Sequence, residues 1–168
     1  MSAIFVGRFQ PFHNGHLAAI KWILKRENQI FIIIGSAQES LTKDNPFSFK
    51  ERREMIKRTL LAENIKNFKI FGIEDLSDDV FWAENIFKIT KLKQKEVTVF
   101  TQNFWTKKCF EQIGVKVKPH PMFFNKLSAT KIREKIRQNK KLGKLLPKEV
   151  LKYFKEIKGR ERIINYVN

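Results

Sequence analysis

Short continuous hydrophobic runs alternate along the chain with longer stretches of helical character. Four runs rich in β-branched and aromatic residues predict strands over Ala3–Val6, Ile30–Ile34, Phe68–Ile73 and Val97–Phe100, and Val115–Val117 is the candidate for a fifth. The unbroken run Ile30–Ile34 indicates a strand that is buried on both faces, as in a parallel sheet. Alternation of strands and helices predicts an α/β protein.

Helices are expected between these strands. Leu17–Leu24 is the first, and Ser48 with Glu51 three residues later forms a capping box that starts the second. Another runs from Val80 through Ile89, and the next carries Cys109 and Phe110. Near the end, Ser128 is a candidate N-cap, Pro147 is expected at a first helical position, and Gly159 is expected to close one helix before a last short one.

Composition narrows the class of protein. A chain of 168 residues with 42% hydrophobic residues is long enough for one domain with a real core. The lone cysteine, Cys109, excludes a disulfide within the chain and lacks an evident histidine partner that would make it a nucleophile. We find no signal peptide core and no apolar run of membrane-spanning length, so a soluble cytoplasmic protein is expected.

The charge is strongly positive and unevenly distributed. The formal net charge is +17, and the stretch from Lys118 to the end holds 15 basic and 4 acidic residues. Such a surplus suits a nucleic acid, an anionic membrane surface or small phosphorylated ligands. A solvated basic surface is the commoner explanation for most of these lysines.

The stretch Gly7–His16, GRFQPFHNGH, joins the first strand to the first helix. Gly7 permits a tight turn, and Asn14 with Gly15 can start a helix whose N-terminus favours an anion. His13 and His16 are three residues apart and therefore share one helix face. Together with Arg8 they form a site that suits a polyphosphate, whereas a purely structural loop does not require this combination.

Further candidate residues lie at strand ends and at a later helix start. Gly35, Ser36 and Gln38 follow the second strand, where small residues leave room for a ligand, and Asn103 follows the fourth strand. Ser128, Thr130 and Arg133 can grip terminal phosphates at a helix start. The acidic run Asp75, Asp78 and Asp79 has the residue types of a metal site, but such runs are more often solvated loops. For Trp82, packing in the core is the alternative to contact with a ligand.

Two of these motifs resemble a known superfamily. GRFQPFHNGH is similar to the HxGH signature of the nucleotidylyltransferases, and in its longer form to the archaeal type of nicotinamide-mononucleotide adenylyltransferase. The segment SATKIR, from Ser128 to Arg133, resembles the SxTxxR signature of the superfamily, and GSAQ and NPF resemble segments of the archaeal type. The chain departs from that pattern at Leu41, where His is frequent, and at Gln102 and Ala129, where Gly is frequent. The loop at 123–126 is also shorter, which leaves the adenine contacts open.

The resemblance implies one doubly wound, Rossmann-like α/β domain over residues 1–168, with a five-stranded parallel sheet and a helical C-terminus. It implies transfer of AMP from ATP to nicotinamide mononucleotide, giving NAD and pyrophosphate. Mg²⁺ is expected to bind mainly through the ATP phosphates, with few or no protein ligands, and a homo-oligomer, such as a hexamer, is expected. The alternatives are a sister enzyme with another acceptor, such as FMN or phosphopantetheine, and a basic nucleic-acid-binding module on the same fold.

The resemblance also assigns residues. It gives catalytic roles to His13, His16, Arg8 and Arg133. It assigns ATP binding to Gly7, Arg8, Phe9, Gln10, His13, Gly15, His16, Asn103, Ser128, Thr130 and Arg133. It assigns the acceptor to Gly35, Ser36, Gln38 and Trp82, with the indole of Trp82 stacked on the cationic pyridine ring.

Overall fold

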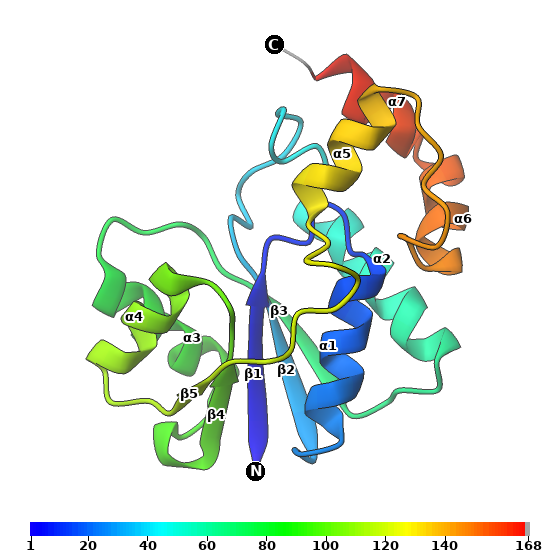
Figure 1. Cartoon of the computed structure of the whole chain (residues 1–168). Helices are drawn as coiled ribbons and strands as arrows, with labels where there is room; N and C mark the ends of the chain where they lie inside the picture. The colour runs from blue at the N-terminus through cyan, green and yellow to red at the C-terminus, as the bar shows by residue number, and fades with distance from the viewer. Residues whose placement is uncertain (167–168) are drawn as a thin grey trace. The chain divides into compact units, whose positions relative to one another are not determined.

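The computed structural model describes residues 1–166. Its strands are β1 (Ser2–Gly7), β2 (Gln29–Ile34), β3 (Phe68–Gly72), β4 (Val97–Phe100) and β5 (Val117–Lys118) (Figure 1). Its helices are α1 (Asn14–Leu24), α2 (Phe49–Ala62), α3 (Asp79–Thr90), α4 (Phe104–Gln112), α5 (Ala129–Arg137), α6 (Lys148–Glu156) and α7 (Gly159–Asn165), with a 3₁₀ turn at Gln94–Glu96.

The five strands form one parallel sheet in the order β3-β2-β1-β4-β5. β1 is central, and the chain builds outward from it on one side through β2 and on the other through β4. Gly7 of β1 pairs with Ile34 of β2, and Phe5 pairs with Phe100 of β4. The ends of β1, β2 and β4 therefore meet at one edge beside a topological switch point, where open α/β sheets bind ligands. The predicted α/β class and five parallel strands are confirmed.

By their internal contacts the residues group into two compact units. The sheet unit consists of 1–7, 19–37 and 67–121, and it contains all five strands with α3 and α4. The helical unit consists of 8–18, 38–66 and Met122 onward, and it contains α2, α5, α6 and α7. The extent of a single domain over the whole chain stays a prediction.

Hydrophobic packing on both faces holds the sheet unit together. Every residue from Ile30 to Ile34 is at most 3% exposed, which confirms the strand buried on both faces. Ile4, Phe31 and Val99 join one core cluster with residues of α3 and α4, including Ile86 and Phe110. Burial of such side chains is the main stabilising contribution, roughly 1.5–3 kcal/mol for each.

The helical unit is organised around α2. Ser48 and Glu51 form the predicted capping box at its start. On the same helix, Arg58 donates to the carboxylate of Glu156 in α6 at 2.7 Å. Just before α2, the ring of Phe47 lies 5.1 Å from that of Phe154. The predicted helical C-terminus is thus confirmed, and α6 packs on α2.

Three predicted boundaries were wrong. β5 starts at Val117 instead of Val115, because the Val115 N–H donates to the Phe110 carbonyl at the end of α4. Pro147 is the N-cap of α6 and not its first helical residue. Gly159 begins α7 and does not close α6; a Cβ there would lie 2.9 Å from the Phe154 ring, so close packing requires the glycine.

Candidate active site

The motif loop between β1 and α1 is fixed from within the helical unit. The side-chain amide of Gln10 donates to the Phe47 carbonyl at 2.8 Å and accepts from the Phe47 N–H at 3.0 Å. Phe9 has a φ of 52°, in the left-handed region that side chains rarely adopt, and the Gln10–Pro11 peptide is cis. Phe9 and Phe12 are fully buried. Gln10 thus positions the loop against the segment that precedes α2.

The two histidines of the motif form a stacked pair. Their ring centroids lie 3.5 Å apart at an interplanar angle of 19°. The backbone N–H of His13 donates to Nδ1 of His16, and the backbone N–H of His16 donates to Nδ1 of His13, both at 3.3 Å. A ring nitrogen that accepts carries no proton, so each neutral imidazole keeps its hydrogen on Nε2. The loop therefore fixes the tautomer of both imidazoles.

Burial sets the protonation of this pair. His13 is 3% exposed, and desolvation lowers its pKa from 6.5 to about 4. His16 packs face to face with Phe12 and edge-on to Phe9. Gly15 is required beside them, because a Cβ there would lie 3.0 Å from both Cε1 and Nδ1 of His13. At neutral pH, His13 is therefore a neutral hydrogen-bond donor.

The start of α1 differs from the expected open anion site. The Asn14 N–H donates to the Leu145 carbonyl at 3.0 Å, and the His16 N–H is used by His13. The Asn14 side chain donates to the Lys144 carbonyl. Two of the first helical N–H groups are thus engaged within the helical unit.

Arg133 of α5 reaches the motif loop. Its Nη1 donates to the Gln10 carbonyl and its Nη2 to the Asp44 carboxylate, both at 2.9 Å. Burial lowers the pKa of this guanidinium, Asp44 opposes that effect, and the nearby cations Arg137 and Arg8 add to it. Arg133 is therefore bonded to the same loop that carries His13 and His16.

The start of α5 also follows the prediction. The Ser128 hydroxyl accepts from the Lys131 N–H at 3.3 Å and caps the helix. Thr130 is exposed in its first turn. In the preceding loop, Phe124, Asn125 and Lys126 have φ values of 52°, 50° and 58°. The signature residues thus stand at a helix start that follows a left-handed turn.

Sequence reasoning missed Arg52. This residue of α2 is fully buried, and its guanidinium donates to the carbonyls of Ser48, Arg8 and Glu39 at 3.3, 3.0 and 3.4 Å. It ties the motif loop to the loop before α2, while the side chain of Arg8 itself is exposed. The available signal was a cation on the buried face of a helix, in register with Met55, Ile56 and Thr59.

Other predicted residues lie at the carboxyl edge of the sheet unit. The Gly35 N–H donates to the Gly7 carbonyl at 3.1 Å, which holds the ends of β1 and β2 together. The Ser36 hydroxyl donates to Asp75 at 3.1 Å. Gln38 belongs to the helical unit and is exposed. The predicted residues are thus divided between the two units, Gly7, Gly35, Ser36, Trp82 and Asn103 in one and the remainder in the other.

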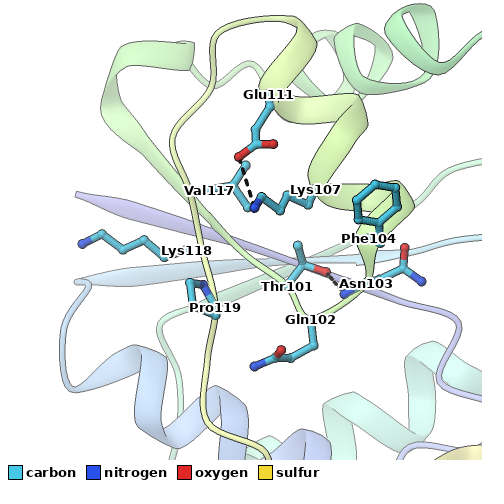
Figure 2. A pocket seen from close by; sticks show the side chains of 9 residues that line it. All are labelled: Thr101, Gln102, Asn103, Phe104, Lys107, Glu111, Val117, Lys118 and Pro119. Atoms are coloured by element: carbon cyan, nitrogen blue, oxygen red, sulfur yellow. Dashed lines mark hydrogen bonds and ion pairs between the residues drawn. The ribbon is translucent and has the colours of Figure 1, made fainter.

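Asn103 caps α4 at the same edge. Its side-chain oxygen accepts from the Thr106 N–H at 2.9 Å. Asn103, Phe104 and Lys118 line a pocket of about 290 Å³ (Figure 2). Gln102 extends from the pocket rim and bonds to the carbonyl of His120. The sheet unit therefore offers a hollow surface beside the predicted ligand residue.

The comparisons with known proteins agree with this geometry. A cytidylyltransferase-like family model matches residues 4–135. The chain is 42% identical over 166 residues to the nicotinamide-nucleotide adenylyltransferase of Thermococcus sibiricus, covering 97% of this chain and 88% of the relative. Identity to the enzyme of the same name from Saccharolobus solfataricus is 39%, over 95% of this chain and 93% of the relative. The chain belongs to the cytidylyltransferase-like family. Within that family it groups with the archaeal nicotinamide-nucleotide adenylyltransferases, as its motifs predicted.

Solved structures support the fold. A bifunctional NMN adenylyltransferase/ADP ribose pyrophosphatase from Francisella tularensis, complexed with AMP and a manganese ion, superposes with a TM-score of 0.81 at 22% identity. The match covers 98% of this chain and 52% of that one, so the chain spans about half of the larger protein. A nicotinate-nucleotide adenylyltransferase from Vibrio parahaemolyticus, described as putative in its title, matches with a TM-score of 0.68 at 19% identity and covers 96% of this chain and 94% of that one.

Trp82 lies where the core-packing alternative places it. It is 1% exposed, and its ring lies 4.7 Å from that of Trp105 and 6.0 Å from that of Phe110. Trp105, which is 40% exposed, donates from Nε1 to Asp79 at 2.8 Å. Among the described residues, Nε1 of Trp82 finds no hydrogen-bond acceptor. Stacking of Trp82 on the pyridine ring stays a prediction for this member of the family, and it requires Trp105 to move.

The acidic run has structural partners. Asp75 accepts from Ser36, Asp78 caps α3 by accepting from the Phe81 N–H at 2.7 Å, and Asp79 accepts from Trp105. Within residues 1–166 no group of three or more His, Cys, Asp or Glu side chains is arranged to hold a metal ion. Each carboxylate of the run is therefore explained by local structure. Among the helices described, none is long and apolar enough to cross a membrane.

Proposed function

We propose that this protein is a nicotinamide-nucleotide adenylyltransferase, which transfers AMP from ATP to nicotinamide mononucleotide and gives NAD and pyrophosphate. The observation that carries the proposal is the stacked His13–His16 pair, held in the Nε2–H tautomer on a loop that also receives Arg133. The relatives that match over nearly the whole chain carry this name. The names of these relatives also argue against the alternative of a sister enzyme with another acceptor.

The reaction is an in-line displacement at the α-phosphorus of ATP. A phosphate oxygen of the acceptor forms the new P–O bond, and the bond from the α-phosphorus to the oxygen bridging to the β-phosphate breaks. The attacking phosphate is already anionic at neutral pH, so the enzyme has no proton to remove from it. Catalysis then depends on orientation and on stabilising charge.

Each residue of the site receives a role in this reaction. His13 and His16 donate from Nε2 to ATP phosphates, with His16 on the α-phosphate. Arg8 and Arg133 neutralise the leaving pyrophosphate, and Ser128 with Thr130 bonds its terminal oxygens. A neutral imidazole is suited to this role, because its donor persists at physiological pH without titrating.

The remaining assignments follow the motif positions. Gly7, Phe9, Gln10, Gly15 and Asn103 shape the ATP site. Gly35, Ser36, Gln38 and Trp82 form the acceptor site.

The site is suited to Mg²⁺ that is bound through the phosphates of ATP. The carboxylates of the acidic run are engaged by Ser36, Phe81 and Trp105. Mg²⁺ takes oxygen ligands, usually from substrate phosphates and water. When bound, it supplies charge neutralisation on the phosphates. The protein is further proposed to act in the cytoplasm as a homo-oligomer, the state that light scattering measures.

The decisive experiment measures pyrophosphate release from ATP and Mg²⁺ with nicotinamide mononucleotide, nicotinate mononucleotide, FMN or phosphopantetheine as acceptor. Release with pyridine nucleotides alone, with NAD formed from the first of them, is expected. Release with FMN or phosphopantetheine alone would instead identify a sister enzyme.

His16→Ala tests the phosphate site. We expect turnover to fall about a hundredfold or more, which is the cost of removing one preorganised donor to developing charge. His120→Asn is the matched control, because His120 lies outside the motif and packs against Phe5. Near-normal turnover of His16→Ala would remove the assignment of this residue to the α-phosphate.

A further inference from the structure

The loop 38–48, between β2 and α2, is held by arginines of the helical unit. Arg133 donates to the Asp44 carboxylate at 2.9 Å, and one turn along α5 Arg137 donates to the Lys43 carbonyl, also at 2.9 Å. Arg52 holds the Glu39 carbonyl at the start of the loop. A reciprocal turn between Thr42 and Asn45 shapes its tip. Asp44 is therefore presented to Arg133 by a loop of defined structure.

The two ends of this ion pair differ in environment. Arg133 is 2% exposed, whereas Asp44 is 68% exposed. Nη1 of Arg133 is already committed to the Gln10 carbonyl in the motif loop, and its buried Nε has no acceptor among the described residues. The guanidinium is thus fixed in place and has donor capacity left over. The carboxylate stands at the solvent side, where it can leave the pair and give way to another anion.

Positive charge exceeds negative charge around Asp44. The positive charges of Arg137 and Arg8 both act on Arg133 and help to lower the pKa of its guanidinium. Asp44 is the carboxylate that forms an ion pair with this group in the described structure. When a polyphosphate arrives, its oxygens compete with that carboxylate for the same guanidinium.

We propose that Asp44 is an internal counter-ion of the phosphate site: it occupies Arg133 when no polyphosphate is bound, and its return displaces pyrophosphate after the reaction. The inference rests on the proposed function, because it takes Arg133 as a ligand of the leaving group. Asp44 is a positioning residue and touches no reacting atom. Its carboxylate weakens the binding of ATP and of pyrophosphate alike, and so prevents product from remaining on the enzyme.

Calorimetric titration of the full-length protein with inorganic pyrophosphate, without Mg²⁺ and without acceptor, tests this directly. Asp44→Asn keeps an oxygen near Arg133 and removes the charge, so the Kd for pyrophosphate is expected to fall about tenfold. Asp44→Ala is expected to act in the same direction. Glu134→Gln is the matched control: it makes the same charge change at an exposed neighbour of Arg133 on α5, and its Kd is expected to stay within about twofold.

Steady-state kinetics provide the second measurement. In Asp44→Asn we expect a lower KM for ATP together with a lower inhibition constant for pyrophosphate, a combination that a merely unfolded or loosened loop would not produce. In an Arg133→Ala background the Asp44 substitution should have no further effect, because the competitor and its target are then both absent.

Two outcomes would overturn the proposal. Unchanged or weaker binding of Mg²⁺-free pyrophosphate by Asp44→Asn would show that the carboxylate does not compete for Arg133. Weaker binding of Mg²⁺-ATP alone would instead make Asp44 a ligand of the metal. Failure of every acceptor to support pyrophosphate release would reject the proposed reaction while the binding titration still reported on Asp44.

Discussion

Acidification tests the burial of His13. Desolvation lowers the pKa of this imidazole from 6.5 to about 4. Between these values the unfolded chain binds a proton at His13 that the folded chain does not bind. Since stability rises with pH wherever the unfolded state holds more protons, His13 makes the fold progressively less stable as the pH falls from about 6.5 to about 4.

The size of the effect follows from the two pKa values. Below about pH 4 the loss in the free energy of unfolding approaches about 3 kcal/mol, and at pH 5 it is about 2 kcal/mol. At pH 5 the imidazole is almost fully protonated in the unfolded chain and mostly neutral in the folded one. No reduction for solvent screening is needed, since the side chain is 3% exposed. This loss is a large share of the free energy of unfolding of a typical domain, which is about 5–15 kcal/mol.

The assay compares urea unfolding at pH 8 and pH 5 for the natural protein and for His13→Asn. The asparagine oxygen replaces Nδ1 as acceptor for the His16 N–H and does not titrate in this range. All other titrating groups are shared by the two proteins. The natural protein is expected to lose about 2 kcal/mol more than the variant. Equal losses, or an NMR titration of His13 with a pKa near 6.5, would refute the buried neutral imidazole.

Three substitutions test other contacts. Gly15→Ala places a Cβ 3.0 Å from the His13 ring, so turnover should fall at least about tenfold in steady-state assays; unaltered kinetics would mean that the ring has room to move. Arg52→Met leaves the Arg8 and Glu39 carbonyls without their donor and should lower the urea unfolding free energy by about 3 kcal/mol; a loss below about 1 kcal/mol would show that water replaces it. Trp82→Phe should raise KM for nicotinamide mononucleotide and spare ATP, whereas Trp82→Ala would also cost about 3–5 kcal/mol by opening a core cavity; an unchanged KM in Trp82→Phe would leave Trp82 a core residue alone.

Features that depend on neighbours in sequence were predictable. The capping box of Ser48 and Glu51 and the cap by Ser128 need only a spacing of three residues, and both are present. The strand Ile30–Ile34 was recognisable because burial on both faces leaves no polar alternation. The GRFQPFHNGH motif was identified by the same kind of local signal, since its two histidines are three residues apart and bond to each other across one turn.

Features that depend on distant partners were not predictable. Arg52 donates to a carbonyl 44 residues away, and Arg133 bonds to Asp44 across 89 residues. Trp105, rather than a ligand, packs on Trp82 in this structure, and nothing in the local sequence of either residue specifies that contact. The sequence predicts that Gly159 ends a helix. In the structure it begins α7, where the ring of Phe154 packs so closely that it leaves no room for a Cβ.

The helical unit gathers three separate stretches of chain, and this has a consequence for biosynthesis. The motif loop leaves the ribosome among the first residues, but Phe47, which holds Gln10, packs in turn on Phe154. A nascent chain that stops short of α6 therefore carries both histidines but lacks the Phe154 ring that packs behind Phe47. The packing that supports the motif loop through Phe47 is completed only after α6 has been translated, so termination before α6 yields a chain with its signature intact and that support missing.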